Sequence, residues 1–333
     1  MEIAIVQKNL KATEIKPSAS FSRYLSLLET DSSRISKERK IDSCPACKSP
    51  NYRPVFDKFG FTFCECETCY SLFSSTSPGE QGLKNFYRDS ESRKFWFEVI
   101  RKETSEVRSR RIFEPTLNWM SGHIEDNSQL SGLPILELMP RSWDLADYWN
   151  SHKSTHQYFL VDPLFQPNSL DRTRFESLIT EKQSGFAAVC LFDALQLSDD
   201  PQELLARAWR HLSPGGVCFV TGILSTGFDV LTLGADSNLI LPPERLRLFS
   251  AGGLEGLIAR SASWEIVEFS TPGQLDFEFV QDAFSKGSHL NRFASYLAGT
   301  KASDPDFLAE FSEFLQKWRL SSHSRVVLRK KLV

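Results

Sequence analysis

The second half of the chain alternates between short apolar runs and longer amphipathic stretches. Apolar runs of strand length occupy residues 135–138, 158–161, 186–192, 217–221 and 264–269. Between them, apolar positions recur at helical spacing over residues 143–149, 202–212 and 254–260. Strands that alternate with helices pack as a parallel sheet with helices on both faces. We therefore expect an α/β domain built in this way.

The end of the chain follows a different pattern. Residues 277–320 carry aromatic side chains at helical spacing, and residues 325–332 return to a strand pattern. We interpret the helical stretch as an insertion that precedes the last strand of the sheet.

The first part of the chain is helical on either side of one distinct segment. Residues 1–40 are polar with one expected helix at 21–29, and residues 83–120 place apolar side chains at helical spacing among charges. Arg108, Arg110 and Arg111 form a basic edge on the second stretch. We interpret this edge as a solvated helix face, because clustered charges on a helix usually face water.

The segment between these helices holds five of the seven cysteines. Cys44 and Cys47 form one C-x2-C pair, and Cys66 and Cys69 form a second pair after eighteen intervening residues. Two such pairs direct four thiolates at one point, as a tetrahedral zinc site requires. The residues between the pairs alternate like short strands. We predict a zinc ribbon in which Zn²⁺ holds the fold and has no open position for chemistry.

The fifth cysteine of this segment, Cys64, lies beside the second pair. It is either a spare thiol or a replacement for Cys66 as a ligand. Reduced thiols packed as small apolar side chains would need no metal, but two matched pairs favour a metal site. A ribbon that binds nucleic acid is disfavoured, since the segment is not notably basic.

These patterns divide the chain into four parts. A polar segment with a short helix spans residues 1–40, the ribbon spans 41–80, a helical connector spans 81–128, and the α/β domain spans 129–333 with its insertion at about 277–320. A chain of 333 residues accommodates this division at about 150 residues per domain.

Composition excludes two classes of protein. Lys and Arg number 39 and Asp and Glu number 42, so the net charge of −3 does not suit a protein that binds nucleic acid by bulk charge. No apolar run approaches the roughly 18 residues of a membrane span. The first residues become charged before a signal peptide could form, so we expect a cytoplasmic protein.

Two segments of the α/β domain resemble a known family. Residues 212–216, Leu-Ser-Pro-Gly-Gly, resemble the turn into the fifth strand of class I S-adenosylmethionine-dependent methyltransferases, and residues 191–201 resemble the segment after the fourth strand. A closer resemblance is to bacterial methyltransferases with an amino-terminal zinc ribbon, found in polysaccharide and natural-product pathways. It rests on pieces that occur in order at residues 44–47, 85–90, 111–115, 225–229, 241–243, 270–276 and 320–323.

This resemblance implies a fold and a site. The fold is a Rossmann-like sheet of seven strands, helices on both faces and an antiparallel last strand, with S-adenosylmethionine bound across the carboxyl ends of the strands. Glu137 and Met139 correspond to the turn after the first strand, and Asp162 corresponds to the acid that takes the ribose hydroxyls. Phe192 and Asp193, after the fourth strand, correspond to residues that line the pocket.

The turn after the first strand departs from the family pattern. The family has an acidic residue followed by glycines at alternating positions, whereas here Glu137 is followed by Met139 and Arg141. Both side chains occupy space where the backbone would meet a ligand. Pro140 also removes an N–H donor. We expect weakened or lost cofactor binding.

A catalytic base is also missing from the pattern. Gln196 and Leu197 stand where the family often has Glu-His, and Arg245 replaces a family histidine that follows the prolines. Leucine cannot accept a proton, so no base is assigned. Among the six histidines, we interpret His211 as a surface or capping residue and His323 as structural.

Three functions follow from these observations. The leading hypothesis is a methyltransferase that uses S-adenosylmethionine on a sugar, polysaccharide or natural-product intermediate. The second is an inactive relative that has lost cofactor binding and serves as a scaffold or partner subunit. The third is a zinc-ribbon binding module that dimerises through its sheet domain. Nicotinamide and flavin binding are excluded, because no G-x-G-x-x-G follows a strand.

Overall fold

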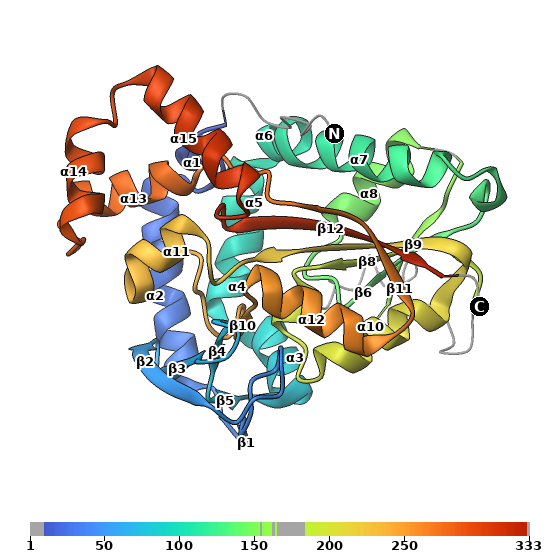
Figure 1. Cartoon of the computed structure of the whole chain (residues 1–333), viewed down its shortest axis with the longest axis horizontal. Helices are drawn as coiled ribbons and strands as arrows, with labels where there is room; N and C mark the ends of the chain where they lie inside the picture. The colour runs from blue at the N-terminus through green and yellow to red at the C-terminus, as the bar shows by residue number, and fades with distance from the viewer. Residues whose placement is uncertain (1–9, 154, 162–163, 165–183, 332–333) are drawn as a thin grey trace.

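The computed structural model of this chain describes residues 10–153, 155–161, 164 and 184–331. Its centre is a mixed sheet with six strands in the described part, in the spatial order β11-β12-β9-β8-β6-β7 (Figure 1). The strands are β6 (Ile135–Leu138), β7 (Tyr158–Val161), β8 (Phe186–Phe192), β9 (Leu212–Ile223), β11 (Trp264–Ser270) and β12 (His323–Lys330). The expected strands are therefore present, and β9 begins earlier than its apolar run.

The direction of the strands matches the expectation of a parallel sheet with one reversed strand. β6 pairs in parallel with β7 on one side and with β8 on the other, and β9 pairs in parallel with β8. β12 is antiparallel to both β9 and β11. The antiparallel last strand is confirmed, while the described residues contain six strands against the seven that the resemblance implies.

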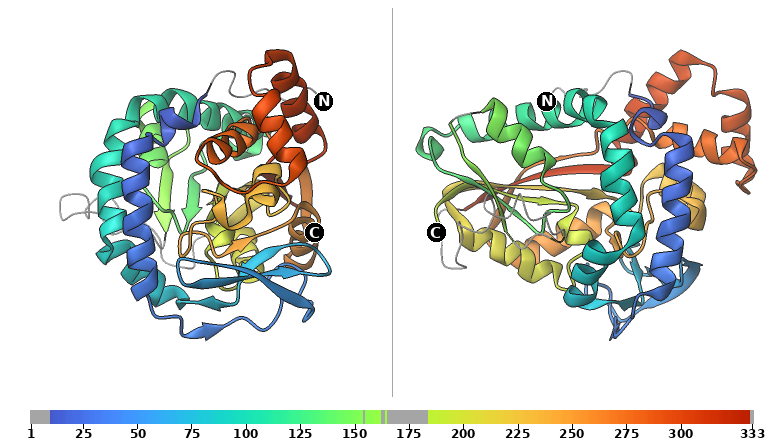
Figure 2. Two further views of the ribbon diagram at one scale, coloured as in Figure 1. Left: turned by 90° about the vertical axis from the view of Figure 1, so that its left-hand side faces the viewer. Right: turned by 180° about the vertical axis from the view of Figure 1, so that it is seen from behind.

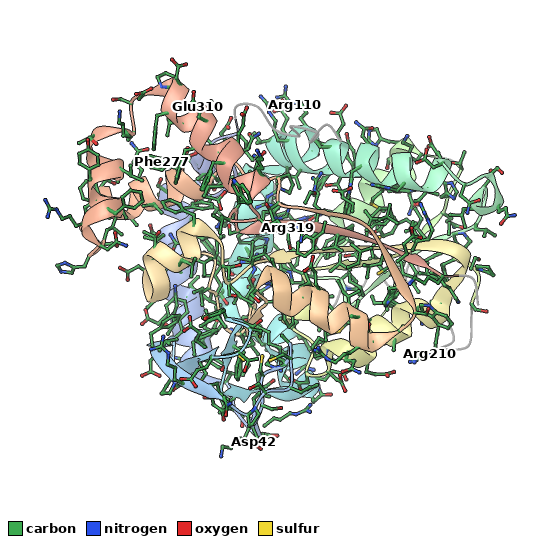
Figure 3. The ribbon with its side chains drawn as sticks, viewed as in Figure 1. Asp42, Arg110, Arg210, Phe277, Glu310 and Arg319 are labelled. Atoms are coloured by element: carbon green, nitrogen blue, oxygen red, sulfur yellow. The ribbon has the colours of Figure 1, made fainter. Side chains whose placement is uncertain are left out.

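Alternation of side chains along the strands gives the sheet two buried faces. Leu136 and Val189 belong to a core cluster shared with α10 (Pro201–His211) and α12 (Ala251–Ser261). The neighbouring positions, Ile135 and Ala188, belong to a second cluster shared with α7 (Glu114–Glu125) and α8 (Asp144–His152). Figures 1 and 2 show these helix pairs on opposite sides of the sheet, and Figure 3 shows side chains filling both layers.

Local caps fix where the two helices of the first face begin. The Asp200 carboxylate accepts a hydrogen bond from the Glu203 amide at 3.1 Å, and Pro201 starts α10. The Ser250 hydroxyl accepts from the Gly253 amide at 2.9 Å at the start of α12. An oxygen before the first turn satisfies an amide that has no partner within the helix, and proline suits the first helical position.

A series of helices forms a wall at the carboxyl ends of the parallel strands. In this wall α2 (Ser18–Arg34) runs beside α4 (Glu91–Phe95) (Figure 2). The ring centroids of Tyr24 in α2 and of Trp96, which follows α4, are 5.1 Å apart. Tyr24, Leu28 and Phe86 form its core together with Leu197 from the loop after β8. The wall consists of α1 (Ala12–Ile15), α2 (Ser18–Arg34), α3 (Gly79–Asp89), α4 (Glu91–Phe95), α5 (Arg101–Glu103) and α6 (Ser105–Arg108).

The aromatic spacing predicts a helical insertion before β12, and the structure has three helices there. They are α13 (Asp276–Ser285), α14 (Arg292–Thr300) and α15 (Pro305–Lys317). Phe277, labelled in Figure 3, contacts Phe307 and Phe311, and it stacks on Phe228 of α11 (Phe228–Leu233). No helix among the described residues combines the length and apolar character that crossing a bilayer would need.

The cysteine-rich segment forms a small sheet, to which the larger domain contributes one strand. The strand order is β10-β4-β3-β2, and all pairs are antiparallel. The strands are β2 (Tyr52–Lys58), β3 (Phe61–Cys66), β4 (Leu72–Ser74) and β10 (Arg247–Leu248), beside a two-stranded pair of β1 (Arg39–Lys40) and β5 (Thr76–Ser77). The buried Arg247 forms an ion pair with Asp199 at 2.6 Å and so ties β10 to the loop after β8.

Candidate ligand cavity and cysteine cluster

A cavity of about 420 Å³ opens at the carboxyl ends of β6, β8 and β9. The strand order reverses between β6 and β8, and α/β sheets bind ligands at such a switch point. Glu137, Phe192 and Asp193 lie in the cavity wall, so three of the residues predicted to contact a cofactor are brought together here. The helical wall and the segment before α13 close the other sides.

The other two predicted cofactor residues have different placements. Met139 has a φ of +52°, the left-handed conformation that favours glycine. Its amide donates to the Val161 carbonyl at 3.0 Å, and its side chain packs against the apolar cores of the sheet and the helical wall. Met139 is not among the residues that line the cavity. Asp162 lies outside the described residues.

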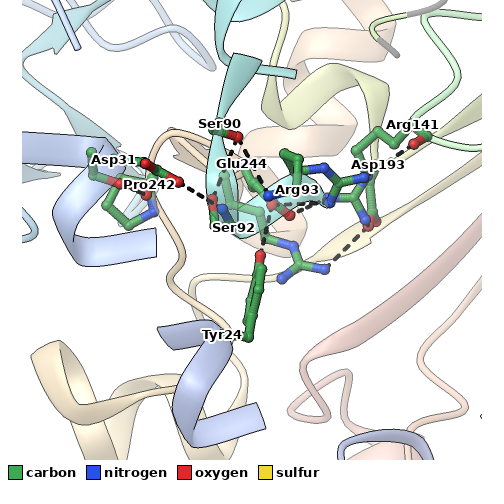
Figure 4. Close-up of polar contacts among 11 residues, drawn as sticks. Tyr24, Asp31, Ser90, Ser92, Arg93, Arg141, Asp193, Pro242 and Glu244 are labelled. Carbon is green, nitrogen blue, oxygen red and sulfur yellow. Dashed lines mark hydrogen bonds and ion pairs between the residues drawn. The ribbon is translucent and has the colours of Figure 1, made fainter. Parts of the chain in front are cut away.

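Arg141 lies across the switch point of the sheet. Its guanidinium group is 2.7 Å from the carboxylate of Asp193, which follows β8, whereas Arg141 itself follows β6 (Figure 4). Arg245 reaches the same Asp193 oxygen at 3.2 Å. Burial alone would raise the pKa of Asp193, but the two guanidinium groups outweigh burial and hold the pKa below its usual value. Asp193 is therefore ionised, and its carboxylate is already paired with two arginines.

A second buried carboxylate extends this ion-pair network into the helical wall. Glu244 is 3.0 Å from the guanidinium of Arg93 and accepts a hydrogen bond from the Tyr24 hydroxyl at 2.6 Å (Figure 4). Arg141 approaches Glu244 at 3.9 Å. Burial would raise the pKa of Glu244, but the Arg93 and Arg141 charges lower it below the usual value. Two carboxylates of the network therefore hold Arg141 in place.

Glu137 is held in its neutral form by its surroundings. The side chain is buried and accepts a hydrogen bond from the Tyr158 hydroxyl at 2.9 Å. Burial raises the pKa of Glu137 to about 8, although the Tyr158 hydrogen bond and the Arg141 charge oppose that rise. At neutral pH the carboxyl group therefore carries a proton and offers little negative charge to the cavity.

Three segments that carry the family resemblance converge beside the cavity. The Asp276 carboxylate accepts hydrogen bonds from the Ser321 hydroxyl at 2.7 Å and the Ser322 amide at 2.6 Å. A Cβ atom at Gly227 would clash with the Ser322 backbone, and one at Gly273 would clash with the Ser321 hydroxyl. Glycine is therefore needed at both positions for this close approach.

His323 lies in the cavity wall. Its interpretation as a structural residue did not predict this position. β12 is antiparallel to β9, and His323 pairs with Ile223, so the start of β12 lies where β9 ends. Burial lowers the pKa of His323 to about 4, and the nearby Arg325 lowers it further, against the opposing charge of Asp193. The imidazole is neutral at pH 7. The sequence offered one signal for this position, the expected antiparallel direction of the last strand. An antiparallel last strand begins at the carboxyl ends of the parallel strands, and the Ser-Ser-His segment stands at its start.

The described residues do not fit S-adenosylmethionine in the position that the resemblance implies. The donor combines a sulfonium and an ammonium with one carboxylate, so it carries a net positive charge. At the switch point, Asp193 is already paired with Arg141 and Arg245, and Glu137 is protonated. Pro140 offers no amide, and the Arg141 side chain crosses the space above the turn.

The four predicted zinc ligands lie together. The sulfur atoms of Cys44, Cys47, Cys66 and Cys69 are all within 4.8 Å of one another. The Cys44–Cys69 and Cys47–Cys66 sulfurs are 3.6 and 3.5 Å apart. A tetrahedral zinc site with Zn–S bonds of about 2.3 Å separates its sulfurs by about 3.8 Å, so the geometry fits. Cys64 is buried outside this group, which excludes it as a replacement for Cys66.

The two cysteine pairs adopt the same local turn. Lys48 has a φ of +64° and its amide donates to the Cys44 carbonyl at 2.8 Å. Tyr70 has a φ of +60° and its amide donates to the Cys66 carbonyl at 2.9 Å. Each turn brings both cysteines of its pair onto one side. The convergence of the four thiols therefore follows from two matching local structures.

Comparison with known proteins yields matches of fold only. No protein-family profile and no curated protein sequence matches the chain. The plantazolicin methyltransferase BamL, solved with SAH, is 10% identical over 76% of this chain and 96% of its own, with a TM-score of 0.42. A methyltransferase from Thermotoga maritima is 15% identical over 71% of this chain and 98% of its own, with a TM-score of 0.40. Phosphoethanolamine N-methyltransferase 2 from Haemonchus contortus was solved with S-adenosyl-L-methionine. It is 17% identical over 66% of this chain and 53% of its own, with a TM-score of 0.39.

These neighbours are S-adenosylmethionine-dependent methyltransferases. Their identities and TM-scores are too low to assign an activity to this chain, because one fold hosts many functions. The residues of the site must therefore decide the function.

Proposed function

We propose that this chain is a methyltransferase-like protein that has lost S-adenosylmethionine binding and acts without transferring methyl groups. The observation that carries this proposal is the ion pair between Arg141 and Asp193. It connects the ends of β6 and β8 across the switch point, where a class I methyltransferase would hold its donor. The protein then serves as a binding protein, scaffold or partner subunit.

The ion pair is costly to displace. Arg141 and Asp193 are both largely buried, and removing one partner from a buried pair leaves an uncompensated charge. A cationic donor that displaced Arg141 would have to replace the charge compensation of Asp193 and also release Arg141 from Glu244. Methyl transfer depends on accurate positioning of donor and acceptor, and an occupied crevice prevents it.

Calorimetric titration with S-adenosylmethionine and with S-adenosylhomocysteine tests the proposal directly. We expect no binding heat from the native protein at millimolar ligand. A double variant, Met139→Gly with Arg141→Gly, restores small residues in the turn and shows whether the turn alone blocks the donor. Binding of either compound to the native protein with a Kd below about 1 mM would overturn the proposal.

A second candidate function is methylation of a sugar, polysaccharide or natural-product intermediate. The observation in its favour is the position of the cavity, which lies at the carboxyl ends of the strands with Glu137, Phe192 and Asp193 in its wall. This function requires Arg141 to leave Asp193 when the donor binds. A crystal soaked in S-adenosylhomocysteine distinguishes the two, because it shows either a parted ion pair with bound ligand or the pair intact.

For the cysteine cluster we propose a structural Zn²⁺ bound by Cys44, Cys47, Cys66 and Cys69. The sulfur separations and the two matching turns support it. Four protein ligands leave no open coordination position, so the ion contributes stability and no chemistry. A cytoplasmic location, where thiols stay reduced, suits such a site. Metal analysis of the purified protein checks the proposal, with one zinc per chain expected.

A further inference from the structure

Cationic side chains from five separate segments meet in the cavity. They come from the residues before α2, from α6, from the turn after β6, from the loop before β10, and from β12. In chain order these side chains are Lys16, Arg108, Arg141, Arg245 and Arg325, and the carboxyl groups that line the same cavity are Glu137, Asp193 and Asp276. Because the segments lie far apart in the sequence, only the fold brings these charges together.

Among the described residues, three of the cations have no anionic partner. In the part of the chain that the structure describes, no carboxylate lies within 4.0 Å of Lys16, Arg108 or Arg325, the distance that defines an ion pair. Arg108 lies over the ring of Trp96 at 5.2 Å, and Arg325 lies over Trp119 at 4.9 Å. Aromatic faces attract and orient a cation without neutralising it.

The carboxyl groups of the cavity do not balance these charges. Glu137 carries a proton at neutral pH, which leaves the two carboxyl groups of Asp193 and Asp276 against five cationic side chains. Asp193 is shared by Arg141 and Arg245. Arg141 and Arg245 each retain a buried N–H group that has no hydrogen-bond acceptor in the described part of the chain. A concave site with excess positive charge and unused donors is complementary to an anion.

We propose that the cavity binds a small molecule that carries a carboxylate or phosphate group attached to an aromatic or apolar body. The cations recognise the anionic group, and Trp96, Phe113, Trp119 and Phe279 provide the apolar wall. A volume of about 420 Å³ lies within the range of about 300–1,000 Å³ that small-molecule sites occupy. This inference rests on the proposed function, since it names the ligand class of the same cavity.

Lys16 adds a dependence on pH. Its amine lies 5.0 and 4.9 Å from two aromatic rings, and burial lowers its pKa to about 7. Among the charged groups that face it, Arg245, Arg108 and Lys58 lower the pKa further, and Asp229 raises it. Bound anion favours the protonated amine, so we expect tighter anion binding at pH 6 than at pH 8.

Titration calorimetry with a matched pair of compounds tests the proposal on the full chain. Indole-3-acetate provides the carboxylate, 1-naphthyl phosphate provides the phosphate, and indole-3-acetamide is the neutral control. We expect at least one anion to bind about tenfold or more tightly than the amide, because charge-assisted hydrogen bonds are stronger than those between neutral groups. Comparison of the two anions identifies the preferred group.

Variants on one strand provide the second part of the test. Arg325→Gln removes a cation from the cavity, whereas Arg329→Gln removes one that pairs with Glu265 outside it and serves as the control. We expect Arg325→Gln to weaken anion binding by about tenfold, while Arg329→Gln leaves it unchanged. Circular dichroism confirms that both variants fold.

Several outcomes would overturn the anion site. These are no binding of either anion at 10 mM, equal binding of the neutral amide, or identical affinities of the two arginine variants. The failure of this inference is distinguishable from the failure of the proposed function. Donor binding in the S-adenosylmethionine titration rejects the proposed function, whereas the anion titrations decide the ligand class independently.

Discussion

Side chains that replace glycine after β6 have structural roles of their own. Met139 keeps the left-handed backbone that a glycine turn would adopt, at a cost of about 1–2 kcal/mol for a residue with a Cβ. Arg141 pairs with Asp193. The next alternating position is Trp143, which stacks on Phe97 with ring centroids 5.4 Å apart. The turn therefore has the backbone shape that favours glycine, while its side chains contact Asp193, Phe97 and the apolar cores.

At this scale the buried carboxyl group of Glu137 predicts a pH dependence of stability. Its pKa is about 8 in the folded protein and about 4.5 in the unfolded chain, so the folded state holds a proton that the unfolded state releases. Stability must then fall as the pH rises from about 4.5 to about 8. Glu137→Gln has a similar shape and carries no charge at any pH. We therefore expect the variant to lack this fall in the free energy of unfolding, which is on the order of several kcal/mol in the native protein.

Urea unfolding of the native protein and of Glu137→Gln at pH 5, 6.5 and 8 measures this effect. The variant should gain stability relative to the native protein as the pH rises, with the largest difference at pH 8. Parallel curves for the two proteins over this range would show that Glu137 is ionised in the fold.

Elements that lie far apart in the chain meet at Glu244. Tyr24 of α2, Arg93 of α4 and Arg141 of the turn after β6 all approach this one carboxylate (Figure 4). The loop that carries Glu244 also places Arg245 on Asp193. The helical wall and the carboxyl edge of the sheet are thus joined through charges, in addition to the apolar core that they share.

This junction predicts that Arg93 is important for stability. Arg93→Met leaves Glu244 buried without its nearest cation, so we expect the free energy of unfolding to fall by about 3–5 kcal/mol. Denaturant unfolding followed by circular dichroism measures the change. Arg88→Met is the control, because the Arg88–Asp89 pair is exposed and should contribute nothing measurable.

A second variant separates charge from packing at the same junction. Arg93→Met combined with Glu244→Leu removes both buried charges, and we expect it to recover most of the lost stability. If the double variant is less stable than Arg93→Met, the two side chains stabilise the junction by packing rather than by charge.

On the scale of the whole molecule, the cysteine-rich sheet is part of one continuous structure. Its strand β4 pairs with β10, which follows the loop that places Arg245 in the cavity wall. The Ser250 hydroxyl donates to the Cys69 carbonyl, and Arg260 of α12 donates to the Ala46 carbonyl. Cys44, Cys66 and the core of the α/β sheet belong to one apolar cluster.

The continuity predicts that loss of the proposed zinc ion destabilises the whole chain. Removal of zinc with 1,10-phenanthroline should lower the Tm by about 10 °C or more, since 1 kcal/mol shifts Tm by about 2–4 °C in domains of 150–250 residues. Tryptophan fluorescence, which reports on the α/β domain, should change in the same transition. Cys66→Ser should reproduce the effect.

Cys64→Ser is the matched control for that experiment, because Cys64 is buried near the cluster but lies outside the group of four sulfurs. It should retain one zinc per chain and most of the native Tm. An unfolding transition of the α/β domain that is unaffected by zinc removal would show that the two parts are independent.

Much of the fold follows from the sequence because local patterns encode it. Apolar runs of strand length matched the bounds of β6, β7 and β8, and alternation along them produces the two faces of the sheet. The two C-x2-C pairs indicated four converging thiols, since each pair forms the same short-range turn. The departure of Met139 and Arg141 from the glycine pattern was also visible.

The candidate ligand site was decided by tertiary structure. Lys16, Arg108 and Arg325 lie in segments with no shared motif, and they face one cavity only because the helical wall and the reversed strand β12 close over the carboxyl edge of the sheet. The pairing of Arg141 with Asp193 likewise joins residues 52 positions apart. Strand patterns and cysteine turns depend on neighbours in the chain, whereas charge complementarity depends on neighbours in space.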